Sequence, residues 1–116
     1  MTTALTRYYY GGQGVQTVTN AAASYTCDAT GAGDHTVFVD RAGAVGITLP
    51  PVSAGRVLKV KDISGAGGTN HITITPASGN IDGAGTYVLT LNYAGVELTC
   101  DGTNWWVTGS YNGTVI

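Results

Sequence analysis

A chain of 116 residues is long enough for one domain with a single hydrophobic core, and it has no room for a second. Only 10% of the residues are charged and the net charge is -2, so the sequence offers no basic field that would gather nucleic acid. No apolar run approaches the roughly 20 residues of a membrane helix, and the first residues lack the apolar centre of a signal peptide. We therefore expect neither a nucleic-acid nor a membrane partner, and synthesis in a cytosol.

The composition predicts an all-β fold. The sequence contains 18 glycines, 18 threonines, 12 valines and 6 isoleucines, which pairs β-branched strand formers with turn residues. No window keeps a helical apolar period, and short runs of alternating polarity are separated by turn signals. The spacing of these runs favours a small antiparallel β-sandwich or a barrel-like module.

The N-terminal residues differ from the rest. Three tyrosines run into three glycines in "RYYYGGQG", and the segment has no partner of its own. Exposed aromatic rings favour packing on another surface. The sequence therefore predicts an extended N-terminal arm over residues 1–14 that packs on another surface through Tyr8, Tyr9 and Tyr10.

Residues 15–109 form the predicted module, and residues 110–116 form a short C-terminal tail. The expected strands cover residues 15–19, 22–27, 36–40, 45–49, 56–63, 71–75, 86–92, 95–100 and 104–108. Alternation within them assigns one face to the interior, and in residues 86–92 that face is Tyr87, Leu89 and Leu91. The predicted core contains Leu58, Val60, Ile72, Ile74, Leu89, Leu98 and Trp105.

Two adjacent tryptophans follow the turn "CDGTN". Neighbouring side chains in a strand point to opposite faces, and Val107 as a core residue places Trp105 inside. Trp106 then points outward beside Thr108. It either covers a second apolar layer of its own module or contacts another protein surface, and both interpretations remain open.

Few residues suggest chemistry. Asp28 and Asp34 bracket a glycine-rich loop, for which a solvated turn is favoured over a calcium site because no third carboxylate or Asp-x-Asp spacing is present. His35 and His71 lie at strand edges without a partner histidine. The remaining aspartates lie at predicted strand ends and turns, where local hydrogen bonding is common: Asp40, Asp62, Asp82 and Asp101. We expect no catalytic residue, no metal, no cofactor and no enzymatic activity.

Cys27 and Cys100 are too few and too far apart in sequence for a zinc site. Two buried thiols are favoured in a reducing compartment, and a disulfide remains the alternative.

Residues 45–109 carry an ordered set of short motifs. They are "TLPP" at 48–51, "AGR" at 54–56, "KD" at 61–62, "NHITITP" at 70–76, "IDG" at 81–83, "YAG" at 93–95 and "DGTNW" at 101–105. In this order they resemble a β-module that recurs in the virion proteins of tailed phages. The preceding residues resemble the opening strands of that module, so the resemblance covers about residues 25–107.

The resemblance implies a virion protein, since the module occurs in tail fibres, tail spikes and small proteins on the outside of the head, typically as trimers. A chain with only a short arm besides the module favours a capsid decoration (cement) protein. It would be assembled in the host cytoplasm, bind the outer capsid surface as a homotrimer, and stabilise the shell by bridging major capsid proteins. The resemblance thus implies that Tyr8, Tyr9, Tyr10 and Trp106 contact the capsid or a second subunit. The alternative is a receptor-binding module of a tail fibre or spike that contacts host glycans.

Overall fold

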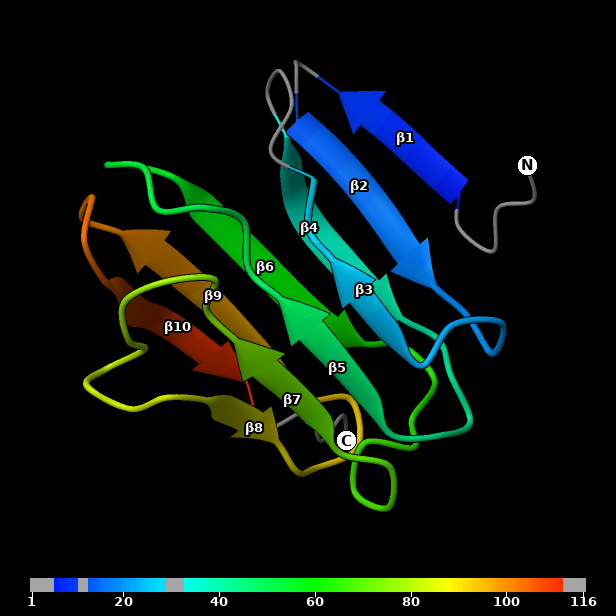
Figure 1. Cartoon of the computed structure of the whole chain (residues 1–116). Coiled ribbons are helices and arrows are strands. Elements are labelled where there is room, and N and C mark those ends of the chain that lie inside the picture. The colour runs from blue at the N-terminus through cyan, green and yellow to red at the C-terminus, as the bar shows by residue number, and fades with distance from the viewer. Residues whose placement is uncertain (1–5, 11–12, 29–32, 112–116) are drawn as a thin grey trace.

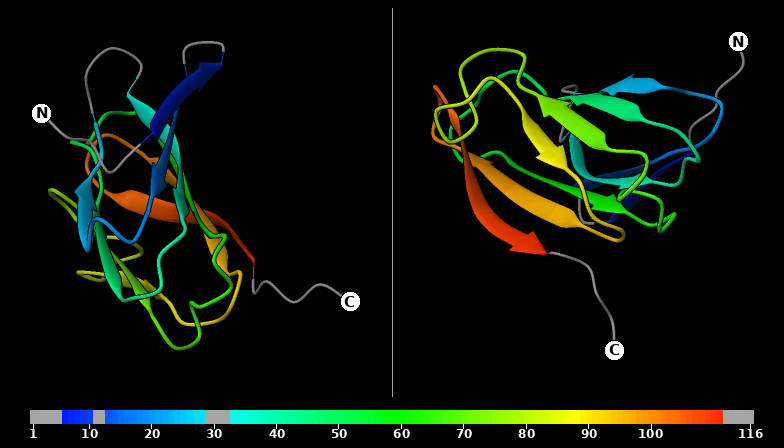
Figure 2. Two further views of the ribbon diagram at one scale, coloured as in Figure 1. Left: turned by 90° about the vertical axis from the view of Figure 1, so that its right-hand side faces the viewer. Right: turned by 90° about the horizontal axis from the view of Figure 1, so that it is seen from below.

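The computed structural model describes residues 6–10, 13–28 and 33–111, which form ten strands in two facing sheets (Figure 1). The two layers are seen from below in Figure 2, within a molecule that measures 35 × 33 × 25 Å. The six-stranded sheet has the order β1 (Thr6–Tyr10), β2 (Gln13–Val18), β4 (Asp34–Val39), β6 (Val57–Asp62), β9 (Gly95–Cys100) and β10 (Trp105–Tyr111). The four-stranded sheet has the order β3 (Ser24–Thr26), β5 (Val45–Thr48), β7 (Ile72–Thr75) and β8 (Tyr87–Leu89).

The all-β prediction is confirmed, and each of the nine expected strands has a counterpart in the structure. Residues 6–10 of the predicted arm form β1, which pairs antiparallel with β2, and β2 itself begins at Gln13. The strand β10 continues to Tyr111, two residues past the predicted end of the module. The side chains of Tyr8, Tyr9 and Tyr10 and most of the predicted tail, residues 112–116, lie outside the described part.

The antiparallel pairing expected for the sandwich is wrong, because both sheets are mixed. From β2 to β7 every strand crosses to the opposite sheet, so β2, β4 and β6 lie side by side in one sheet and β3, β5 and β7 in the other. After two crossings the chain is back in its first sheet and runs in the same direction as before. Neighbouring strands in the series β2, β4, β6 and in the series β3, β5, β7 are therefore parallel. Among the described strands, the antiparallel pairs are those that involve β1 or one of the last three strands. They are β1 with β2, β7 with β8, β6 with β9 and β9 with β10.

The register of both parallel and antiparallel pairs places β-branched side chains directly across neighbouring strands. Val37 pairs with Val60, which pairs with Val96, and all three are buried. In the facing sheet Ile47 pairs with Ile74, and both are buried. Branched side chains pack well on a pleated surface, which explains the bias of the composition toward valine, isoleucine and threonine.

Two loops at one end of the sandwich meet through a glycine. Gly79, between β7 and β8, has a φ of +72, and a Cβ added there would lie 2.2 Å from the main-chain oxygen of Thr103 in the turn between β9 and β10. Gly83, in the same loop, has a φ of +80, and nothing lies within 4 Å of its added Cβ. Alanine variants of Gly79 and Gly83 therefore separate the energetic cost of a left-handed backbone, which both would have, from the cost of the contact with Thr103, which only Gly79 would have.

Replacing Gly83 by alanine is expected to lower the free energy of unfolding by about 1 to 2 kcal/mol, the cost of a left-handed residue with a side chain. Replacing Gly79 by alanine should lose about 1 to 3 kcal/mol more, because the Thr103 carbonyl must also move. Urea unfolding of the two variants measures the difference. Equal losses would contradict the close approach of these two loops.

Candidate binding surfaces

Exposed apolar side chains gather at one end of the sandwich. The structure describes six large apolar residues that are at least 40% exposed, and five of them lie where β6 and β10 end, around β8 and in the turn before β9. We call these five residues the apolar end: Ile63, Val88, Leu91, Tyr93 and Tyr111. The sixth, Trp106, lies at the opposite end of β10. Large apolar side chains that cluster in this way mark a contact surface more often than single exposed ones do.

A groove crosses the apolar end between the edge strands of the two sheets. It is lined by residues 87–91 on one side and by Ser110 and Tyr111 on the other, with Ala94 and Gly95 between them, and its volume is about 140 Å³. A cavity of that size holds one six-membered aromatic ring. No acidic or basic side chain lines the groove, so an uncharged group suits it.

The buried carboxylate of Asp62 accepts hydrogen bonds from two segments of the apolar end. Its Oδ1 accepts hydrogen bonds from the N–H of Ser64 (2.9 Å), the hydroxyl of Ser64 (2.7 Å) and the N–H of Gly65 (3.3 Å). Its Oδ2 accepts from the N–H groups of Gly67 and Tyr93, both at 2.9 Å. The loop after β6 and the turn before β9 are therefore tied to one side chain.

Burial raises the pKa of Asp62, but the hydrogen bonds from Ser64, Tyr93 and Gly67 outweigh it and hold the pKa below its ordinary value. The neighbouring Lys61 donates a hydrogen bond from Nζ to the main-chain oxygen of Tyr93 and lies 5.5 Å from the centre of its ring. Tyr93 has a φ of +61, which an ordinary turn would leave to glycine. These contacts fix an aromatic side chain that stays 46% exposed.

The edge of the six-stranded sheet along β10 is covered in its first half only. Trp105 donates from its N–H to Asn80 (2.8 Å) and accepts from the N–H of Asp82 (3.0 Å), and Val107 donates to Oδ1 of Asp82 (2.9 Å). A register shift follows between Val107 and residue 109, after which Ser110 pairs with Val96.

The backbone groups of Ser110 face away from β9. Val96 and Val60 are paired between β9 and β6, in the alternation where Cys100 N–H donates to Arg56 and Asp62 N–H to the Ala94 carbonyl. The residue opposite Val96 on β10 therefore directs its N–H and C=O outward. This exposed edge lies beside the groove, and none of the contacts that cover the first half of β10 reaches it.

Trp106 forms a second exposed feature, at the start of β10. It is 45% exposed, and its Nε1 donates to Oδ2 of Asp101 at 2.9 Å. The other carboxylate oxygen of Asp101 accepts from the N–H groups of Thr103 (2.9 Å) and Asn104 (2.8 Å). The N–H of Asn104, the indole of Trp106 and the N–H of Thr103 lower the pKa of Asp101. The turn thus orients an indole ring that is about half exposed.

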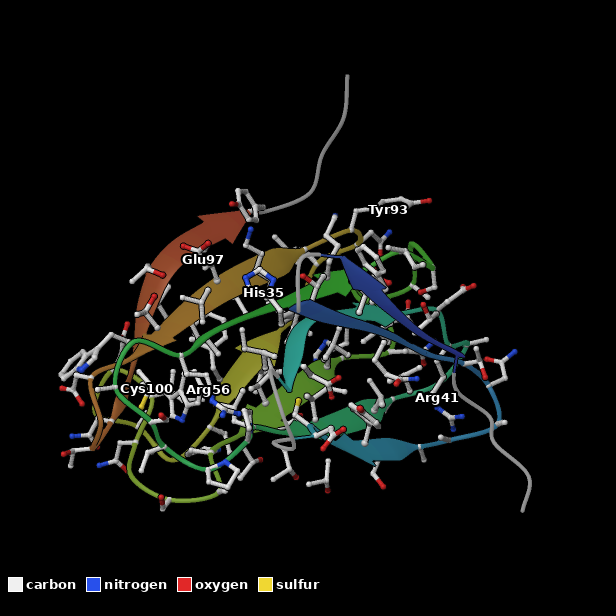
Figure 3. The ribbon with its side chains drawn as sticks, turned by 90° about the horizontal axis from the view of Figure 1, so that it is seen from above. His35, Arg41, Arg56, Tyr93, Glu97 and Cys100 are labelled. Atoms are coloured by element: carbon white, nitrogen blue, oxygen red, sulfur yellow. The ribbon has the colours of Figure 1, made fainter. Side chains whose placement is uncertain are left out.

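Polar side chains surround this ring on the outer face of the six-stranded sheet. The hydroxyl of Thr108 lies 3.0 Å from that of Thr99 and donates to Glu97 at 2.9 Å, and Glu97 lies 3.8 Å from Nζ of Lys59. His35 is on the same face, where Figure 3 shows it near Glu97. Burial and the positive charge of Lys59 lower the pKa of His35, while Glu97 opposes them.

The structure buries every residue of the predicted core: Leu58, Val60, Ile72, Ile74, Leu89, Leu98 and Trp105. Cys27 and Cys100 are buried thiols. Asp34 is buried as well, and its Oδ2 accepts from the Tyr25 hydroxyl and the Asp28 N–H, while the expected turn between Asp28 and Asp34, residues 29–32, lies outside the described residues. The local role expected for Asp62 and Asp101 is confirmed by their hydrogen bonds.

Within residues 6–10, 13–28 and 33–111, no three histidine, cysteine, aspartate or glutamate side chains come together as metal ligands. In the same part of the chain no helix is long and apolar enough to cross a membrane. Sequence reasoning missed the groove and the exposed half of β10. Comparison with known proteins finds no family model and no curated protein that matches the chain.

Proposed function

We propose that this protein is a phage capsid decoration protein that binds the outer head surface as a trimer and bridges major capsid proteins. The observation that carries the proposal is the pair of exposed apolar features on a compact, weakly charged β-fold, one at each end of β10. A protein that contacts both its own copies and a shell needs two such surfaces. The resemblance of residues 25–107 to the tailed-phage β-module supports a virion context for both surfaces.

Stabilisation of the shell would be mechanical. Each copy buries apolar side chains against neighbouring subunits, and the free energy of that burial opposes the outward pressure of packaged DNA. The low charge favours contacts driven by apolar burial over electrostatic steering. In this proposal Trp106 contacts the shell and the apolar end contacts other copies.

Replacing Trp106 by alanine should weaken binding to expanded heads by about 30-fold, the loss of a 2 kcal/mol contact. The free energy of unfolding should change by less than about 0.5 kcal/mol, because the side chain is half exposed. Thr75→Ala, an exposed change on β7 in the other sheet, is the control and should bind as wild type does. Co-sedimentation with purified expanded heads measures both.

Full binding by folded Trp106→Ala would remove this residue from the shell contact. A wild-type protein that fails to sediment with heads at all would overturn the decoration proposal itself.

The second candidate is the receptor-binding module of a tail fibre or spike. The observation that favours it is the Trp106 ring with hydroxyl and carboxylate groups of Thr99, Thr108 and Glu97 nearby, since sugars stack on such rings and hydrogen-bond to such neighbours. Copy number in purified virions separates the two candidates. Many copies on the head support decoration, and a few at the tail support adhesion.

A further inference from the structure

We propose that the trimer forms by edge pairing, with the exposed half of β10 in one copy hydrogen-bonded to β1 of the next copy. This inference rests on the trimer of the proposed function and names the surfaces that would make it. The two strands are the opposite edges of the same six-stranded sheet, so the pairing continues that sheet from copy to copy. The partner is thus a second copy of this chain.

The edge of β10 is the first half of the argument. Proteins protect sheet edges from pairing, and here Asn80 and Asp82 cover Trp105 and Val107. Beyond the register shift that cover ends, and the N–H and C=O of Ser110 face outward beside exposed Tyr111. An edge covered in one half and open in the other is suited to accept one short strand.

The groove is the second half. It adjoins Ser110, it has room for one aromatic ring, and no charged side chain lines it. Three of the five residues of β1 are tyrosines, Tyr8, Tyr9 and Tyr10, so this strand carries the aromatic rings that a groove of this size accommodates.

The pairing is heterologous, because different edges meet, and a rotation of one third of a turn closes it into a ring with three identical contacts. The competing arrangement is a two-fold pair of β10 edges. In that arrangement no aromatic ring of the partner would enter the groove, because the Tyr111 of each copy already lines the groove of its own copy. Closure through β1 fills three grooves and leaves no β10 edge open.

Replacing Ser110 by proline tests the edge. Proline removes the outward N–H and is tolerated on an edge strand, so the fold should persist while the molar mass falls threefold, to the 11.8 kDa of one chain. Ser110→Ala keeps the N–H and should remain a trimer. Light scattering on the full chain reads the mass, and circular dichroism checks the fold.

A second variant keeps the test decisive if Ser110→Pro fails to fold. Ser110→Cys is therefore combined in turn with a cysteine at each position of β1, residues 6–10. At least one of these double variants should form intermolecular disulfides on mild oxidation and give a covalent trimer on a denaturing gel, while each single variant should not. A folded Ser110→Pro trimer, or a complete set of double variants that gives only dimers or monomers, would overturn the edge pairing. Neither result would affect binding to heads, so the decoration proposal is tested separately. A wild-type chain that is monomeric in solution and on heads would overturn the trimer and the pairing together.

Discussion

Replacing Trp105 by alanine is expected to lower the free energy of unfolding by about 3 to 5 kcal/mol, the loss for a fully buried aromatic side chain. Trp105 is 0% exposed and lies in the core cluster between the two sheets. Its main chain also joins β10 to Asn80 and Asp82, so a collapse around the lost indole would disturb the covered half of that edge. Domains of this size have a total stability of about 5 to 15 kcal/mol, so the variant should be marginal.

Urea unfolding at neutral pH measures this loss, and Trp106→Ala is the matched control one residue away. The two variants remove the same side chain from the interior and from the surface, and the control should stay within about 0.5 kcal/mol of wild type. Equal losses in the two variants would mean that the register of β10 differs from the one described.

Replacing Asp62 by asparagine is expected to cost about 2 to 3 kcal/mol at neutral pH. Both carboxylate oxygens accept hydrogen bonds only, and an amide would point two N–H donors at groups that are themselves donors. The loop after β6 and the turn that carries Tyr93 should then loosen together. Asp101→Asn is the matched control, since Asp101 is exposed and accepts hydrogen bonds from its own turn and from Trp106.

The cost should also depend on pH. Because the pKa of Asp62 is lower in the folded protein, its stabilisation is fully present above the unfolded pKa of about 4 and is lost as the pH falls through the folded pKa. The difference in unfolding free energy between wild type and Asp62→Asn should therefore shrink below about pH 4. Urea unfolding between pH 7 and pH 2.5 measures it, and a difference that grows toward acid would contradict a lowered pKa.

Local pattern was enough to predict where strands lie and which face they bury. "RVLKVKDI" alternates so clearly that Leu58 and Val60 could be placed inside before any partner strand was known. Alternation does not reveal the direction of the partner strand, however, because a strand with parallel neighbours and one with antiparallel neighbours show the same alternation of faces. From β2 to β7 the chain alternates between the two sheets, and this makes neighbouring strands within each sheet parallel. Loop lengths and core packing set this alternation, so the antiparallel prediction failed for these strands.

The errors at strand ends have equally local causes. "TRYYY" has no polar alternation, so β1 was missed as a strand and placed in an arm. Leu91 follows the period of Tyr87 and Leu89, yet β8 ends at Leu89 and Leu91 is 48% exposed. Leu91 instead lines the groove. The groove lies between residues 87–91 and residues 110–111, which are far apart in sequence, so no local pattern predicts it.

The two tryptophans are the part of the candidate site that the sequence located best. A turn with a clear signature fixes the register of the strand that follows it, and Trp105 and Trp106 take the inner and outer positions that this register requires. The role of Asp62 was anticipated only in part. Its contacts with Ser64 and Gly65 are local, whereas its bond from Tyr93 joins residues far apart in sequence.

Electron cryomicroscopy of intact virions tests the central claim most directly. The account predicts three-fold density of this protein on the outer surface of the head, with β10 of each copy beside β1 of its neighbour and Trp106 against the shell. Density for the protein confined to the tail, with a bare head surface, would contradict it.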